Sequence, residues 1–482
     1  MFNIKAIIKI LGFLLIVEGA FMLLAFCVSL IYQEHDMIPI LKSALLSIFI
    51  GGITVFATRN AQKNISKNDG FIIVSLVWVI FSFFGSLPYL ISGSIPNLTD
   101  AFFETMSGFT TTGSSILNDI ESLPHGILFW RSMTQWLGGM GIIVLSLAIL
   151  PVFGIGGMQL FAAEVPGPVP DKLNPKIQQT AKNLWAIYVL FTLVETVLLW
   201  VGGMTLFDAI NHSFTTMATG GYSTKQASIA HWDSAYIQYV ITFFMFIAGT
   251  NFTLSYSALT GKFDKVYKNE EFKYYVLFIV TFTAIIFSGL LLSTRLGFEQ
   301  AFRDTLFQVV SIITTTGFAT VDFLTWTPFL IILLFALFFF GGSAGSTGGG
   351  IKIMRIVLLL KNSYYELRRL LHPNAVIPVR FNKRSVSEHI ITNVLAFFMI
   401  YLIIFFISTI IFTLIEPDMD SAMGAVATSL GNIGPGLGKF GPAENFYAVH
   451  PVGKWFLAFL MLLGRLELFT VLVLFSPAFW KK

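Results

Sequence analysis

The sequence predicts an all-α polytopic membrane protein with ten transmembrane helices. The last eight are expected to form four pseudo-symmetric helix–pore loop–helix repeats around a central pore, and the first two are extra N-terminal spans. Composition supports this class, because 55% of the 482 residues are hydrophobic and only 12% are charged. A second observation is a recurring pattern of short segments, each ending in a glycine that follows small or hydroxylated residues. These segments are residues 110–113, 217–220, 314–317 and 431–434.

Ten apolar stretches of about 20 residues, the length that crosses a bilayer, follow one another along the chain. They cover residues 10–32, 38–58, 71–93, 127–153, 184–205, 235–259, 274–294, 327–360, 390–415 and 454–479. The first stretch follows Lys5 and Lys9, but it is too long for a signal peptide and lacks a small-residue cleavage site. It is therefore expected to remain as a span.

Lysine and arginine collect in alternate loops, after the even-numbered spans and at the C-terminus. These residues are Arg59, Lys63, Lys67, Lys172, Lys176, Lys182, Lys262, Lys265, Lys268, Lys273, Arg368, Arg369, Arg380, Lys383, Arg384, Lys481 and Lys482. The positive-inside rule places these loops and both termini in the cytoplasm. The four glycine segments lie in the other loops and enter from outside. The net charge of +4 reflects this asymmetry, and no nucleic-acid partner is expected.

The glycine segments recur at nearly even spacing. Their last residues are 107, 97 and 117 positions apart (220−113, 317−220, 434−317), and each follows an aspartate by 12 to 14 residues. The aspartates are Asp100, Asp208, Asp304 and Asp420. Two spans per unit leave all units in one orientation, so they surround an axis along the membrane normal. The predicted divisions are the two N-terminal spans in 1–70 and repeats in 71–155, 184–262, 274–360 and 390–482.

Each glycine segment follows a stretch too short to cross a membrane. These stretches, 100–109, 208–216, 304–313 and 420–429, are predicted to be re-entrant helices with the aspartate as N-cap. Their C-terminal ends, partly negative, would point toward the pore centre and favour cations. Non-helical backbone at membrane depth must be buried or line a water-filled path. Four such loops therefore predict an ion pore whose glycines let carbonyl oxygens turn inward.

The eighth span contains a glycine- and serine-rich interruption at residues 341–350. At about 1 kcal/mol of helix propensity lost per glycine, the span should break in mid-membrane. A broken segment beside a pore is a candidate gate, and the alternative is close helix packing through small residues. A nucleotide loop is excluded because no Gly-Lys-Ser/Thr follows at the required spacing. The candidate gate residues are Gly345, Ser346, Thr347, Gly348, Gly349 and Lys352.

Charged residues inside spans are functional by default. Arg465 lies roughly 16 Å into the last span and would place a positive charge below the glycine segments, hindering ions and pairing with the gate. The alternative is a structural ion pair, for which Glu467 is a poor partner because i,i+2 residues do not face each other. Glu18 and Glu195 are also intramembrane, and a helix–helix hydrogen bond or a role in transport would explain either.

Several stretches together resemble the superfamily of potassium transporters that includes TrkH, KtrB and the fungal Trk proteins. They are Gln-Trp-Leu-Gly-Gly-Met-Gly at 135–141, Ala-Thr-Gly-Gly-Tyr-Ser at 218–223, Thr-Thr-Thr-Gly-Phe at 314–318 and Gly-Asn-Ile-Gly-Pro-Gly at 431–436. The resemblance runs from about residue 70 to the end, and the two earlier spans are similar to those of the TrkH branch. It implies a potassium filter with one key glycine per repeat. The expected filter residues are Thr111, Thr112, Gly113, Thr219, Gly220, Thr315, Thr316, Gly317, Asn432, Ile433 and Gly434.

The resemblance also implies partners and a location. It implies a homodimer in the lipid of the cytoplasmic (inner) membrane, regulated by a cytosolic nucleotide-binding subunit of the TrkA type. Potassium is the substrate, and no covalent cofactor is expected. The fourth segment has no threonine before its glycine, so fewer carbonyl sites and modest selectivity are expected.

The leading hypothesis is potassium uptake through a selective pore gated from the cytoplasm. The alternative is a symporter that couples potassium to sodium or protons, which would need a titratable or dedicated ion site that the filter segments do not contain. An enzyme is disfavoured, because no nucleophile–base set or metal cluster appears on the spans.

Overall fold

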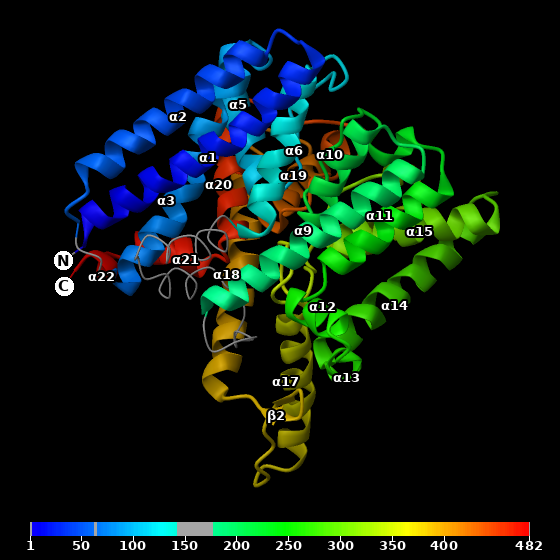
Figure 1. The fold of residues 1–482 in the computed structure, drawn as a ribbon. Helices are drawn as coiled ribbons and strands as arrows, with labels where there is room; N and C mark the ends of the chain where they lie inside the picture. The colour runs from blue at the N-terminus through cyan, green and yellow to red at the C-terminus, as the bar shows by residue number, and fades with distance from the viewer. Residues whose placement is uncertain (1, 62–64, 142–176, 482) are drawn as a thin grey trace.

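The protein is mostly helical in the computed structural model, which describes residues 2–61, 65–141 and 177–481 (Figure 1). Within these ranges, six helical stretches are long and apolar enough to cross a membrane. They are α1 (Ile4–Tyr32), α2 (Met37–Ala57), α3 with α4 (Lys67–Gly85 and Leu87–Ser92), the greater part of α9 (Ile177–Val201), α14 (Glu270–Ser293) and α18 (Glu388–Phe412). They match six of the ten predicted spans, and the chain is a polytopic helical membrane protein.

Two more predicted spans are sharply bent. α11 (Ala235–Ala248) and α12 (Phe252–Leu259) differ in direction by 108°, and α20 (Pro451–Arg465) differs by 110° from the helical stretch that begins with α21 (Phe469–Leu472). The first break is made by Gly249 and Asn251, which cap the two helix ends. From the sequence, residues 235–259 and 454–479 were each predicted as one span, with no bend.

The two remaining predicted spans differ in another way. α6 (His125–Gly139) occupies the first half of the predicted span 127–153, and residues 142–153 lie outside the described part of the chain. The same applies to the basic residues Lys63, Lys172 and Lys176. The predicted span 327–360 consists of α16 (Pro328–Leu337) and α17 (Ile353–Leu371), separated by residues 338–352.

Four shorter helices precede the glycine segments. They are α5 (Leu98–Phe109), α10 (Leu206–Met217), α15 (Phe298–Ile313) and α19 (Met419–Gly431). The predicted aspartate caps are wrong, because each helix begins earlier than expected. The N-cap residues are Asn97, Thr205, Gly297 and Asp418. Three of the aspartates lie in the first turn, where their negative charge interacts favourably with the positive end of the helix dipole. Asp304 lies further along α15.

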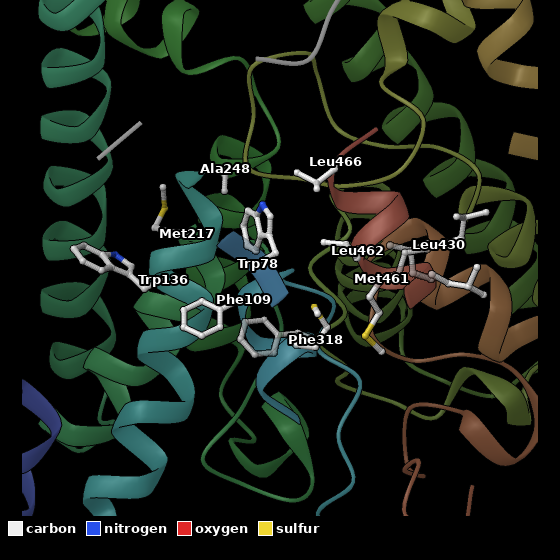
Figure 2. Packing of buried hydrophobic residues seen from close by; sticks show 14 of the residues in the cluster. Trp78, Phe109, Trp136, Met217, Ala248, Phe318, Leu430, Met461, Leu462 and Leu466 are labelled. Carbon is white, nitrogen blue, oxygen red and sulfur yellow. The ribbon is translucent and has the colours of Figure 1, made fainter. Parts of the chain in front are cut away.

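The hydrophobic core surrounds the ends of these short helices. Helices such as α14 and α18 lie at its periphery and expose apolar side chains on the surface. Figure 2 shows part of the packing, with side chains from α3, α5, α6, α10, α11, α19 and α20. Its labelled residues are Trp78, Phe109, Trp136, Met217, Ala248, Phe318, Leu430, Met461, Leu462 and Leu466. On α14 and α18, apolar side chains such as Val280 and Ile410 are exposed. Such helices suit a lipid environment.

The N-terminal pair, α1 and α2, is fastened to the rest of the fold through the turn between them. Backbone N–H groups of His125 and Ile127 donate to Glu34 Oε2 (2.6 Å) and Asp36 Oδ2 (3.1 Å). The two carboxylates thereby cap the exposed amide end of α6. At the other end of α1, the centres of the Phe2 and Phe479 rings are 5.6 Å apart. The two chain termini are therefore neighbours, as Figure 1 also shows.

One end of the molecule is extended by α12, α13 (Phe263–Lys268), α17 and a two-stranded hairpin, at the bottom of Figure 1. The hairpin strands are β1 (Arg380–Phe381) and β2 (Arg384–Ser385), which pair antiparallel. Many of the basic residues that predict a cytoplasmic side lie on these elements, including Lys265, Lys268 and Arg369.

Candidate functional site

The four short helices end in the same unusual backbone turn. Just past each helix end lies a non-glycine residue with a left-handed φ. These are Thr111 (54°), Thr219 (53°), Thr315 (58°) and Asn432 (53°). A left-handed L-residue costs roughly 1–2 kcal/mol and persists only where its surroundings hold it, often at functional sites. Four of them at equivalent positions indicate a common site.

Two residues further on, each segment has a glycine with a positive φ. These are Gly113 (85°), Gly221 (75°), Gly317 (81°) and Gly434 (110°). A Cβ atom on any of them would meet a backbone carbonyl of the next segment more closely than real Cβ atoms approach. The contacts run from Gly113 to Gly220, from Gly221 to Thr316, from Gly317 to Ile433 and from Gly434 to Thr112. This order is cyclic, so the segments form a closed ring that requires glycine. We call residues 110–114, 218–222, 314–318 and 431–435 the ring segments.

The ring corrects the predicted register of the second segment. Gly220 was expected to be its key glycine, but Gly220 holds the position of Thr112: their N–H groups donate to equivalent helix carbonyls, Thr215 (2.8 Å) and Ser107 (2.9 Å). Gly221 is the counterpart of Gly113. With this register, the glycine follows the aspartate by 13 residues in each of the first three repeats (113−100, 221−208, 317−304).

The corrected register makes a testable distinction between two adjacent glycines. Gly221→Ala should markedly lower the preference for potassium over sodium, because the new Cβ would meet Thr316 O and strain a positive φ. Gly220→Ala should have a smaller effect, because its Cβ would mainly displace the Gln135 side chain. Competition of external potassium and sodium with rubidium uptake measures both. A larger loss for Gly220→Ala would contradict the corrected register.

Backbone carbonyls in the ring are buried without hydrogen-bond partners. Among the described residues, no hydrogen bond reaches the carbonyl oxygens of the four left-handed residues, which are fully buried. These oxygens belong to Thr111, Thr219, Thr315 and Asn432. Buried carbonyls are nearly always paired with protein, water or an ion. A ring of unpaired oxygens fits the coordination of a dehydrated cation such as potassium.

Side-chain hydrogen bonds from α6 and from within the ring hold the ring segments in place. Gln135 on α6 donates from Nε2 to Gly220 O (2.6 Å) and accepts at Oε1 from Tyr222 N (3.0 Å). Asn432 Nδ2 donates to Thr112 Oγ1 (3.0 Å), which joins the first and fourth segments. These bonds cross between repeats, so the ring is fixed by several elements at once.

The predicted gate and Arg465 meet directly beside the ring. Arg465 Nη1 donates to Thr111 Oγ1 (3.0 Å) and to Thr347 O (2.7 Å), and Nη2 donates to Gly139 O (3.1 Å). Gly349 N in the same loop donates to Thr315 Oγ1 (2.7 Å). The loop at 338–352 therefore contacts the third ring segment directly. The Arg465 guanidinium joins the loop to the first ring segment and to α6.

Other contacts fix the remaining predicted gate residues. Gly345 O accepts from Phe252 N (3.0 Å), Lys352 Nζ donates to Gly348 O, and Thr347 Oγ1 donates to Met217 O (3.0 Å). Ser346 is bonded through its backbone, and its hydroxyl has no partner among the described residues. The loop thus fits into the break between α11 and α12.

The chain matches known cation transport proteins over nearly its whole length. A family described as "TrkH: Cation transport protein" matches residues 38–482. The chain belongs to the TrkH family. Its relatives include the Trk system potassium uptake protein TrkH of Salmonella typhimurium, 44% identical over the full length of both chains. Another is the Trk system potassium uptake protein TrkG of Escherichia coli, 32% identical over 99% of each chain.

A solved structure has the same fold. The crystal structure of the potassium transporter TrkH from Vibrio parahaemolyticus matches with a TM-score of 0.90 at 40% identity, covering 99% of this chain and 100% of that one. The sequence-based recognition of the family is confirmed by these comparisons.

In this TrkH-family chain, a cavity of about 1000 Å³ lies against the loop on the side of the basic hairpin. Gly345, Gly348, Lys352 and Arg465 line one part of it, and residues 381–387 line another. No ring segment lines the cavity. The loop and Arg465 therefore stand between this cavity and the ring.

A buried ion pair that the sequence did not predict lies behind the first ring segment. Glu104 on α5 and Arg131 on α6 are both buried, with Nε to Oε1 at 2.7 Å. Arg131 also donates to Ser223 O (2.9 Å), and its guanidinium lies 3.6 Å from the Tyr222 ring centre. The pair therefore links the first two repeats of this TrkH-family fold. The signal in the sequence was that Glu104 and Arg131 are charged residues within apolar segments.

Loss of this pair should strongly destabilise the protein. Glu104→Gln would leave the Arg131 charge buried without its counter-ion, and breaking such pairs costs about 3–5 kcal/mol. Thermal or denaturant unfolding in detergent micelles measures the change. Glu416→Gln is the matched control, because it breaks an ion pair with the exposed Lys439 and should cost less than about 1 kcal/mol. Equal losses in the two variants would refute the prediction.

Proposed function

We propose that this protein takes up potassium across the cytoplasmic membrane through a selective, gated pore. The observation that carries the proposal is the closed ring of four segments, whose buried carbonyl oxygens have no hydrogen-bond partner within the described part of the chain. The left-handed residues and glycines would set these oxygens around one potassium ion, replacing its water shell. The names of the full-length relatives, which describe potassium uptake, support the same substrate.

The proposed architecture has ten spans, with four repeats at 71–155, 184–262, 274–360 and 390–482 around the ring. The cyclic order of the glycine contacts supports this arrangement, because each repeat contacts the next and the fourth returns to the first. The adjacent termini support placing both on one side, and the basic residues of α13, α17 and the hairpin support the cytoplasm as that side.

In the proposed gate, Arg465 and the loop at 338–352 obstruct the path below the ring. A guanidinium bonded to Thr111 and to Thr347 places a positive charge where a cation would have to pass. Like charges repel strongly in a poorly hydrated path. Displacement of the loop and Arg465 together would open the way into the cavity.

Regulation is proposed to come from a second copy of the chain and a cytosolic nucleotide-binding subunit of the TrkA type. α17 supports an assembly through an exposed apolar stripe at helical spacing, which is Leu360, Tyr364, Leu367 and Leu371. The basic hairpin beside it offers a surface for an acidic partner. Mass measurement of the detergent-solubilised protein with Leu367→Glu tests the dimer, and a mass unchanged from the wild-type dimer would refute the use of this stripe.

The function is tested with liposomes that contain the purified chain. Rubidium uptake is measured with potassium inside and with no sodium or pH gradient. We expect uptake down the electrical gradient, reduced by external potassium far more than by sodium. Uptake that appears only when a sodium or proton gradient is imposed would instead establish the symporter. A variant that lacks the Arg465 guanidinium should conduct if the wild-type chain is held shut.

A further inference from the structure

The chain turns sharply at the end of α20, just after Arg465. The turn is formed by Glu467 (φ 56°) and Leu468 (φ 47°), two consecutive non-glycine residues with a positive φ. We call residues 466–468 the elbow. Such backbone is found where the surrounding structure over-determines it, and it is common at switch regions. The surroundings of the elbow therefore reveal what keeps it bent.

One ion pair and a buried leucine hold the elbow. Glu467 Oε2 accepts from Arg355 Nη2, and the two side chains are only 20% and 10% exposed. The Arg355 guanidinium lies 4.1 Å from the Phe397 ring centre on α18. Leu468 is buried, and its N–H donates to Leu463 O (3.0 Å). The carboxylate of Glu467 is thus the polar side-chain contact that ties the elbow to α17.

The ion pair also connects the elbow, through α17, to the C-terminal end of the loop at 338–352. α17 begins at Ile353, directly after the loop, and Arg355 lies in its first turn. On the other side of the elbow, Arg465 holds Thr347 within the same loop. The elbow is therefore connected to the loop twice, once through each arginine. A movement of α17 cannot leave both contacts unchanged.

We propose that Glu467 is a positioning residue of the gate: its ion pair with Arg355 keeps the elbow bent and so holds Arg465 beside Thr111. This inference rests on the proposed function. We call the ion pair between Glu467 and Arg355 the latch. Glu467 and Arg355 do not contact the ion in this scheme; they act through Arg465. When α17 moves and the pair separates, the strained elbow relaxes and carries the guanidinium away from the ring.

The geometry of the pair suits a latch that can be released. Only one oxygen of the carboxylate and one terminal nitrogen of the guanidinium are joined. Glu467 Oε1 and Arg355 Nη1 have no hydrogen-bond partner in the described part of the chain. A bidentate pair would be stronger and more rigid. A single bond leaves less to break when α17 moves.

The test is a set of variants in which the latch and Arg465 are removed separately and together. The purified full-length chain is placed in liposomes, and the rate of rubidium uptake is measured for Glu467→Gln, Arg355→Gln and the double variant. Each single variant should raise the uptake rate by about tenfold. The double variant should raise it little beyond either single variant, because the effects of substitutions at two residues that act as a unit are not additive. Glu467→Gln should also add little to Arg465→Ala.

Controls separate this role from a merely structural one. Glu366→Gln breaks an ion pair with Arg369 on the same helix, away from the elbow, and should leave the rate unchanged. The preference for potassium over sodium should stay as in the wild type, because the ring is untouched. If Glu467→Gln folds poorly, Arg355→Lys gives the same comparison with the charge retained and should raise uptake less than Arg355→Gln.

Two results distinguish failure of this inference from failure of the pore itself. If wild-type or Arg465→Ala protein conducts rubidium with a potassium preference and Glu467→Gln does not raise the rate, the latch is overturned and the pore stands. If Arg465→Ala, Glu467→Gln and wild-type protein all fail to conduct while remaining folded, the latch and the proposed pore are both overturned.

Discussion

Replacing Gly113 by serine should reduce the discrimination between potassium and sodium by about tenfold or more, equivalent to at least about 1.4 kcal/mol of lost selectivity. Gly113 has φ 85°, and its missing Cβ lets Gly220 O of the second ring segment come close. A serine there strains its own backbone and pushes the neighbouring carbonyl aside. Because the ring is cyclic, the displacement passes to the next contact and widens the opening.

The change is measured by competition of external potassium and sodium with rubidium uptake in liposomes. Gly93→Ser is a matched control, because Gly93 has a similar φ of 75° but no atom within 4 Å of its Cβ position. This control carries the same backbone strain without the collision. Unchanged discrimination in Gly113→Ser, or an equal loss in Gly93→Ser, would count against the ring as the selectivity filter.

The second large effect is expected for Arg465→Ala, which should raise the rate of rubidium uptake by about tenfold or more. The variant removes a positive charge beside Thr111 and also removes the bond that holds Thr347 in the loop. Both changes favour passage of a cation.

Arg465→Lys separates these two contributions. A lysine keeps the charge but cannot form the forked set of bonds to Thr111, Thr347 and Gly139. Its uptake rate should fall between those of the wild type and Arg465→Ala. Initial rates at equal protein content in the vesicles provide the comparison. A rate in Arg465→Ala at or below that of the wild type would show that the arginine is only structural.

The sequence predicted the helical membrane class and the recurrence of the glycine segments, because both depend on local composition and spacing. It did not predict the register of the second segment. Gly220 and Gly221 are adjacent, and both lie 12 to 14 residues after Asp208, so this range does not tell which of them is the counterpart of Gly113. The helix hydrogen bonds that end at Ser107 and Thr215 decide this, and they depend on where each helix stops.

Breaks in the helices that follow the second, third and fourth ring segments were only partly predictable. Ten consecutive small residues at 341–350 indicate a break, because glycine and serine lower helix propensity. The turn between α11 and α12 had a weaker signal, with Gly249 and Asn251 at the helix ends. The elbow had none, because Glu467 and Leu468 adopt a left-handed backbone that only tertiary contacts impose. For the same reason the pairing of Glu467 with Arg355 could not be foreseen.

The most direct test of the central claim is to locate the ion. Crystals of the protein grown in rubidium instead of potassium would be measured at the rubidium absorption edge. We expect an anomalous peak at the centre of the ring, from a rubidium ion coordinated by the carbonyl oxygens of Thr111, Thr219, Thr315 and Asn432. Rubidium bound elsewhere, or an ordered ring with no peak in a protein that conducts rubidium, would contradict it.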